Sequence, residues 1–163
     1  MSYHDSEIRI NVTIVANNVW EGIGSFDRSE AVVTYSKIMF NRYGVSSHNN
    51  ASLKIHFSAI SDNIDYGALG YSFISLNATY NWWGDPSGPY HPTLNPNGTG
   101  DKVSGNVLFK PWLTSLPHDI RFLNQEYAFT SIGKVCRWEW HSLGNRTCGN
   151  RRIIRSDFRT NLN

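Results

Sequence analysis

The chain has 163 residues, of which 40% are hydrophobic and 17% are charged. This length allows one domain of ordinary size, and the composition argues against disorder throughout the chain. The formal net charge is +2, but the segment from Lys134 onward is basic and the part before it is slightly acidic. No apolar run approaches the roughly 18 residues of a membrane-spanning helix, and the start lacks the basic and apolar regions of a signal peptide. The sequence therefore predicts no membrane span and no signal peptide in this chain.

Short runs rich in β-forming residues come first along the chain. They cover residues 8–15, 31–40 and 53–60. In the third run Leu53, Ile55 and Phe57 alternate with polar residues, a period of two that places one set of side chains inward and the other outward. Helical periodicity is absent, and the Asn-Gly or Asp-Gly signal of a two-residue hairpin is missing between the runs. We therefore predict an all-β body without tight hairpins.

A repeated motif accompanies these runs: an apolar residue, an Asn three positions later, and a Gly three or four positions further on. Its members are Val15, Asn18 and Gly22; Ile38, Asn41 and Gly44; Ile60, Asn63 and Gly67; and Ala78, Asn81 and Gly84. A period of roughly 20–25 residues is typical of a solenoid, whose repeats bury their apolar faces only by stacking. Equivalent residues of stacked coils lie about 4.8 Å apart. We therefore predict an Asn ladder at one corner, and glycines that supply positive φ at sharp turns.

Residues 77–113 form a long and distinctive segment that is rich in Trp, Pro, Asn and Gly. The pieces that carry a resemblance are residues 81–84, 85–89, 95–101, 103–106 and 111–113. The segment resembles the closing part of right-handed parallel β-helix proteins of the pectate-lyase-like kind, which recurs in bacterial and archaeal cell-surface and secreted proteins. The resemblance implies a right-handed parallel β-helix of about four coils over residues 1–113, with a C-terminal cap. Residues 114–163 are expected to form a divergent basic tail that is partly ordered or disordered.

The expected cap is built from tryptophan and proline. Trp82 and Trp83 can cover the end of the last coil, and Trp112 can pack back against the body as a clasp. The prolines stop further strands from pairing with that edge. They are Pro86, Pro89, Pro92, Pro96 and Pro111. Sugar stacking is an alternative for the Trp pair, but neighbouring residues of a strand face opposite sides.

Members of the resembled family include polysaccharide lyases, hydrolases, epimerases and proteins without demonstrated activity, so the fold alone does not give the function. A lyase needs a base and a cation that neutralises a carboxylate; a hydrolase needs a carboxylate pair, for which Asp62 and Asp65 are the close pair in the body. The candidates for such a site are Lys37, Arg42, Lys54, His56, Asp62 and Asp65. The competing interpretation is that the Asp residues cap turns and that the Lys and His side chains are solvated.

No metal site is predicted. The loop at residues 95–101 offers the oxygen ligands of a calcium site but lacks the glutamate of the helix-loop-helix pattern, and a turn stabilised by Asn and Gly is the preferred interpretation. Cys136, His141 and Cys148 match no zinc pattern. The two cysteines either form a disulfide in an oxidising compartment or remain free thiols.

The preferred functional hypothesis is a non-catalytic fragment of a secreted or surface β-helix protein, serving as a structural or carbohydrate-binding module. The alternative is a polysaccharide lyase or glycoside hydrolase that acts on an acidic polysaccharide through strands bearing Lys54 and His56. A third hypothesis, nucleic-acid binding through the basic tail, competes with a solvated chain end.

The opening strand pattern has no capping element, which is typical of a piece of a longer protein. We therefore expect an extracellular or cell-surface location for the parent protein. A polysaccharide or cell-surface glycan is the expected partner, and edge-to-edge self-association through the open end is a further expectation.

Overall fold

Three parallel sheets contain nearly all the regular structure in the computed structural model of the protein, which describes residues 7–121 and 123. Sheet 1 consists, in spatial order, of β1 (Glu7–Asn11), β4 (Glu30–Thr34), β7 (Ser52–His56), β10 (Leu76–Asn77) and β13 (Val107–Leu108). Sheet 2 consists of β2 (Ile14–Ala16), β5 (Lys37–Met39) and β8 (Ala59–Ser61). Sheet 3 consists of β11 (Pro89–Tyr90), β12 (Gly100–Gly105), β9 (Tyr66–Ser72), β6 (Tyr43–Asn49) and β3 (Glu21–Ser25).

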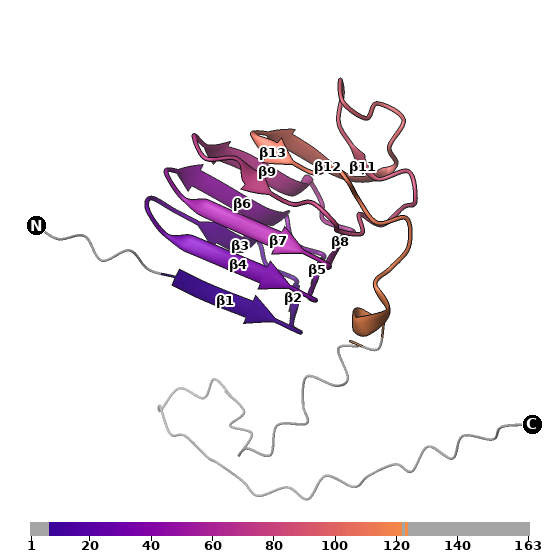
Figure 1. Ribbon diagram of the computed structural model, residues 1–163, viewed down its shortest axis with the longest axis horizontal. Coiled ribbons are helices and arrows are strands. Elements are labelled where there is room, and N and C mark those ends of the chain that lie inside the picture. Colours follow the sequence, from indigo (N-terminus) through magenta and orange to yellow (C-terminus); the bar gives the residue numbers. More distant parts are fainter. Residues whose placement is uncertain (1–6, 122, 124–163) are drawn as a thin grey trace, which may run out of the picture. The chain divides into compact units, whose positions relative to one another are not determined.

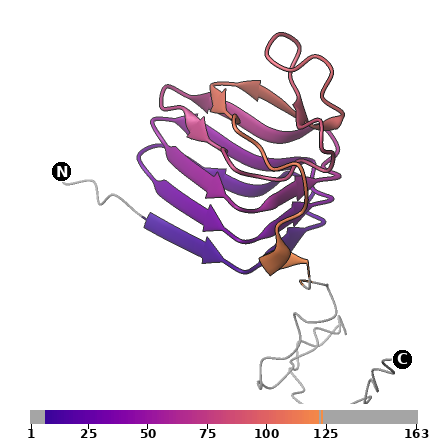
Figure 2. The same ribbon diagram turned by 45° about the vertical axis from the view of Figure 1, so that its right-hand side comes forward.

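Each coil of the chain contributes one strand to each sheet, and successive coils stack in parallel. The first coil is β1–β3, the second β4–β6 and the third β7–β9; Figures 1 and 2 show them as layers, with β1 at one end of the stack. A partial fourth coil contains β10 and a parallel bridge between Trp82 and Ala59. The prediction of an all-β parallel β-helix is therefore confirmed, with three complete coils and a partial fourth.

The core lies inside the coils, where aliphatic residues of successive strands form continuous rows. In register are Val33 with Ile55, Ile38 with Ile60, and Val45 with Ala68. All six of these side chains are fully buried. Branched aliphatic residues fit the pleated inner surface of a sheet, and their burial is the main source of stability for a repeat that has no core of its own.

A ladder of side-chain amides runs along the corner between sheets 2 and 3. The backbone N–H and the Nδ2 of Asn18 both donate to Oδ1 of Asn41, at 3.1 and 2.8 Å. The same two groups of Asn41 donate to Oδ1 of Asn63, each at 3.1 Å. Those of Asn63 donate to Oδ2 of Asp101, at 3.1 and 2.8 Å. The fourth member of the ladder is thus Asp101, and not Asn81 as expected from the sequence.

Asn81 belongs to a second ladder, at the corner between sheets 1 and 2. The backbone N–H of Thr13 donates to Oγ of Ser36, that of Ser36 to Oγ of Ser58, and that of Ser58 to Oδ1 of Asn81, at 3.2, 3.1 and 3.0 Å. Asn81 lies 23 residues after Ser58, which is one full coil. The short interval between Asn63 and Asn81 is therefore a change of corner and not a tightened coil.

The expected positive φ is confirmed at one glycine of the repeated motif, Gly84, whereas the other three have a different role. Positive φ among the described glycines occurs at Gly84, Gly88 and Gly105, and not at Gly22, Gly44 or Gly67. A Cβ on Gly44 would lie 2.5 Å from the carbonyl oxygen of Gly67 and 2.9 Å from Nδ2 of Asn63. Glycine is therefore required at residue 44 because the neighbouring coil approaches closely, and any side chain would collide with the Asn ladder.

An aromatic cap covers the end of the stack opposite to β1. Trp83 is fully buried in the core, Phe109 is 2% exposed, and their cluster includes the half-buried Trp112. Trp112 stacks on Phe109 with ring centroids 6.3 Å apart, and its Nε1 donates to the carbonyl of Pro86 at 3.2 Å. Trp82 is half-buried and is not part of the core cluster. The expected Trp82–Trp83 cover is thus corrected to Trp83, Phe109 and Trp112, because adjacent strand residues point to opposite sides.

The described chain continues beyond residue 113 and returns along the side of the stack. Leu113 donates its backbone N–H to the carbonyl of Asn81, Ile120 in the 3-10 helix η1 (His118–Ile120) is buried, and Nζ of Lys37 donates to the carbonyl of Leu123 at 2.6 Å. In Figures 1 and 2 this segment lies beside the coils near β2. The disulfide candidates Cys136 and Cys148 lie outside the described residues. Among the described residues, no helix is long and apolar enough to cross a membrane.

Asn41→Ala tests the amide ladder. Asn41 is fully buried and contacts both neighbouring coils, so its removal leaves the amides of Asn18 without their acceptor. We expect a loss of about 2–4 kcal/mol in the free energy of unfolding, measured by urea titration. The control is Asn50→Ala, since Asn50 is exposed. If the ladder did not contribute to stability, Asn41→Ala and Asn50→Ala would have the same free energy of unfolding.

Candidate functional site

The residues that the sequence nominated for chemistry lie in three separate places. Lys54 and His56 are on β7 in sheet 1, and Lys37 is on β5 in sheet 2. Arg42, Asp62 and Asp65 lie near the corner between sheets 2 and 3. The candidates that share one outer face are therefore Lys54 and His56.

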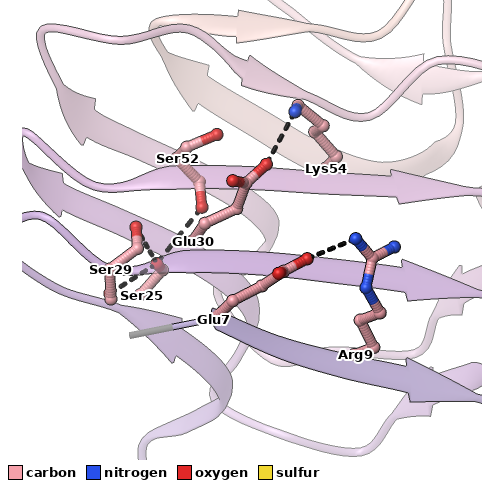
Figure 3. A network of polar contacts seen from close by, with 7 residues as sticks. All are labelled: Glu7, Arg9, Ser25, Ser29, Glu30, Ser52 and Lys54. Carbon is pink, nitrogen blue, oxygen red and sulfur yellow. Dashed lines mark hydrogen bonds and ion pairs between the residues drawn. The ribbon is translucent and has the colours of Figure 1, made fainter. Parts of the chain in front are cut away.

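The outer face of sheet 1 is polar, and its charges are paired. Nζ of Lys54 lies 2.7 Å from Oε1 of Glu30 on the preceding coil, and Arg9 pairs with Glu7 on β1, as Figure 3 shows. The hydrogen bond and the charge of Lys54 hold the pKa of Glu30 below its ordinary value. Lys54 thus has a carboxylate partner within the protein, and a ligand carboxylate would have to compete with Glu30 for it.

A serine cluster lies at the N-terminal side of this face. Oγ of Ser25 lies 2.9 Å from Oγ of Ser29, and it donates to the carbonyl of Ser52 on the third coil at 3.3 Å. Figure 3 shows these three residues to the left of the Glu30–Lys54 pair. Within the described residues no hydrogen bond joins the hydroxyls of Ser25 and Ser29 to a His; those of Ser25 are to Ser29 and Ser52. They join the first coil to the third instead.

His56 is held in one tautomer by the next coil. Its Nδ1 lies 2.9 Å from the carbonyl oxygen of Thr79. Because a carbonyl only accepts hydrogen bonds, Nδ1 carries the proton and Nε2 presents a lone pair. This arrangement orients the imidazole for accepting a proton at Nε2, two residues along the strand from Lys54.

The carboxylates Asp62 and Asp65 have different partners. Oδ2 of Asp65 lies 2.7 Å from Nε of Arg42, whose guanidinium lies over the ring of Trp20 at 4.7 Å. Oδ2 of Asp62 instead accepts from the hydroxyl of Ser61 at 3.0 Å. Asp65 is therefore neutralised by Arg42, and the carboxylate that interacts with Asp62 is Asp101.

Asp101 is the most perturbed acid among the described residues, and the sequence did not nominate it as a catalytic candidate. Its pKa is raised to about 6, chiefly because burial disfavours the carboxylate; the charge of Asp62 also raises it, and the hydrogen bonds from Asn63 oppose the rise. A perturbed acid beside a second carboxylate is a common feature of catalytic sites, and it also occurs in structural networks. Here Oδ2 of Asp101 is the terminal acceptor of the Asn ladder.

Lys37 is also engaged. Burial lowers the pKa of its ammonium group, and Nζ donates to the carbonyl of Leu123. This lysine ties the returning C-terminal segment to sheet 2. It does not share a face with Lys54 and His56.

The loop considered for calcium is held by its own amides. Nδ2 of Asn95 donates to the carbonyls of Ser87 and Pro89, at 2.9 and 2.7 Å. The carboxylate of this segment, Asp101, accepts its bonds from Asn63 in the ladder. No group of three or more His, Cys, Asp or Glu that could hold a metal ion occurs within residues 7–121 and 123.

Aromatic side chains that are exposed or half-buried form columns along the stack. Tyr35, Phe57 and Tyr80 occupy equivalent corners in successive coils and stack with centroids 5.6 and 5.9 Å apart. Phe26, His48 and Tyr71 form a second column, with centroids 4.5 and 5.4 Å apart. In the first column both pairs of rings are stacked. In the second column Phe26 stacks on His48, whereas Tyr71 is tilted by 37° against His48 and is 64% exposed.

Comparison with known proteins yields no relative for this chain. No protein-family model matches the sequence. No curated protein and no solved structure matches it either.

Asp101→Asn tests the half-buried acid. Its folded pKa of about 6 lies above the ordinary 3.8, so folding favours the protonated form and this contribution to stability is lost as the pH rises from about 4 through about 6. Asn keeps an acceptor for Asn63 and cannot ionise. We expect the variant to be more stable than the parent by about 3 kcal/mol at pH 8 and equal to it at pH 4, measured by urea titration. The control is Asp119→Asn, since Asp119 is exposed. The assignment would be contradicted if the difference in unfolding free energy between Asp101→Asn and the parent were the same at pH 8 as at pH 4.

Proposed function

We propose that this chain is a non-catalytic structural module of a secreted or cell-surface β-helix protein of the pectate-lyase-like kind. The observation that carries the proposal is the use of the charged and hydrogen-bonding side chains. Several side chains that could take part in catalysis instead form hydrogen bonds or ion pairs with the neighbouring coil. The pairs are Glu30 with Lys54, Arg42 with Asp65, His56 with Thr79, and Asp27 with Asn49.

These contacts favour a structural role because each one joins two coils. A catalytic site gathers several groups around one point where a substrate binds. Here the groups are spread over three faces, and each is matched to a partner that its own fold supplies. The same pattern of inter-coil contacts supports the resistance to unfolding that a surface spacer requires.

Glycan binding is the second possible role of a non-catalytic module. A sugar ring stacks on the face of an aromatic ring, and in the column of Tyr35, Phe57 and Tyr80 neighbouring rings already stack on one another. The stacking within this column supports a structural role over sugar stacking there.

A polysaccharide screen tests the proposal. The full chain is incubated with acidic and neutral polysaccharides, and unsaturated products, new reducing ends and binding are measured separately. We expect neither cleavage nor elimination. Turnover of any substrate would overturn the non-catalytic assignment, whereas binding without turnover would replace the structural role with glycan binding.

An enzyme acting on an acidic polysaccharide is the alternative function, and the orientation of His56 is the observation that favours it. With Nδ1 bonded to Thr79, Nε2 could accept a proton from a uronate while Lys54 neutralises the carboxylate. This mechanism predicts that Lys54→Ala and His56→Ala each reduce turnover at least about a hundredfold. Lys102→Ala, an exposed lysine on β12, is the matched control, and turnover that persists in both site variants would exclude this site.

A further inference from the structure

Within residues 7–121 and 123, the apolar core is open at the end formed by the first coil. Ile10 is half-buried, whereas its in-register partners Val33 and Ile55 are fully buried. Val12 and Trp20 in the same coil are 53% and 58% exposed. Trp20 has Arg42 over one ring face. An exposed apolar surface of this kind marks an interaction site when a partner of complementary shape and hydrogen-bonding groups can cover it.

In the part of the chain that the structure describes, the backbone of this coil is also unpaired on one side. β1, β2 and β3 are the outermost strands of sheets 1, 2 and 3, and among the described residues each pairs only with the second coil. Edge strands with free N–H and C=O groups are templates for an added strand. The three edges together offer one continuous coil of such groups.

The two corner ladders show which kind of strand fits. In both, the N–H of the lower coil donates to a side-chain oxygen of the coil above: Ser36 to Ser58, and Asn41 to Asn63. At the base of the ladders, Oδ1 of Asn18 accepts no hydrogen bond from the described residues. Oγ1 of Thr13 likewise accepts none there; it donates to the carbonyl of Asn11. The open end therefore presents two acceptors, and it needs a coil that offers N–H donors at both corners.

A second copy of this chain does not meet that need. Two first coils placed end to end would bring acceptors against acceptors at both corners. The other end of a copy is closed by Trp83 and Phe109, and the N–H of Asp101 already donates to the carbonyl of Trp83 at 2.9 Å. The ladder polarity thus disfavours self-association, which the exposed edges alone would have allowed.

We propose that the first coil docks a parallel β-coil of a partner polypeptide. Backbone N–H groups of that coil donate to Asn18 Oδ1 and Thr13 Oγ1, and aliphatic side chains continue the rows that end at Ile10 and Val15. The partner is a β-solenoid segment with small or polar residues at the corners. This inference rests on the proposed structural function, because it gives the module its neighbour in a longer stack.

A peptide of residues 30–51 is the probe. It is the sequence of the second coil, in which Ser36 and Asn41 have the spacing of Thr13 and Asn18, and in the fold it already donates to the coil above. We expect saturable binding of the labelled peptide to the full chain, measured by fluorescence anisotropy. A scrambled peptide of the same composition should not bind.

Two variants remove the proposed acceptors. Thr13→Val is isosteric and keeps the N–H that donates to Ser36; Asn18→Ala also removes a bond to Asn41, so its folding is checked by thermal melting. Each should weaken peptide binding about threefold to tenfold, as expected for one hydrogen bond. Thr114→Val, an exposed site beyond the cap, should leave binding unchanged. Peptide binding that is absent, or equal in Thr13→Val and the parent, overturns the proposal.

Hydrogen exchange on the full chain distinguishes the other occupants. We expect the outward amides of β1–β3 to exchange freely and to become protected when the peptide is added. Protection that grows with protein concentration would identify a second copy as the occupant. Protection that depends neither on the peptide nor on the protein concentration would identify another segment of the same chain as the occupant. Occupation by a second copy or by another segment of the chain overturns the proposal. None of these outcomes depends on polysaccharide turnover, so this inference and the non-catalytic assignment fail separately.

Discussion

The hydrogen bonds that join equivalent corner residues of successive coils are the interaction on which this structure depends. They fix the register of the stack, because an Asn such as Asn41 bonds the coil below through its oxygen and the coil above through its nitrogen. Once the register is fixed, the aliphatic rows coincide and the core is continuous. The requirement for glycine at position 44 follows from the same contact, since the ladder of the neighbouring coil leaves no room for a Cβ.

The stacking also explains how polar side chains are used on the outside of the stack. Parallel coils place equivalent residues about 4.8 Å apart, so opposite charges at equivalent positions meet directly, as Arg42 and Asp65 do just before the registered pair Tyr43 and Tyr66. Aromatic rings at equivalent corners meet face to face in the same way, as Phe57 does with Tyr80. Chemistry that needs several groups at one point competes with this geometry, which pairs each group with its neighbour along the stack.

Much of the fold could be predicted from sequence because its period is local and regular. Asn18, Asn41 and Asn63 are separated by one coil each, and that spacing alone indicated the ladder. Asp101 was missed as the next member because the loop after Gly84 interrupts the period, so it follows Asn63 by 38 residues. The candidate site was harder, since strand alternation places Lys54 and His56 outside but does not reveal Glu30 or Thr79 as their partners. Those partners depend on the register between coils, and the raised pKa of Asp101 depends on burial that only the folded stack creates.

Nuclear Overhauser contacts between backbone protons of the full chain test the central claim most directly. A parallel stack predicts contacts between β4 and β7 that join residues 22 positions apart, with Val33 opposite Ile55 and Ala31 opposite Leu53. Contacts whose residue numbers rise on one strand and fall on the other would show antiparallel hairpins. That result would contradict the stacked coils and the ladders.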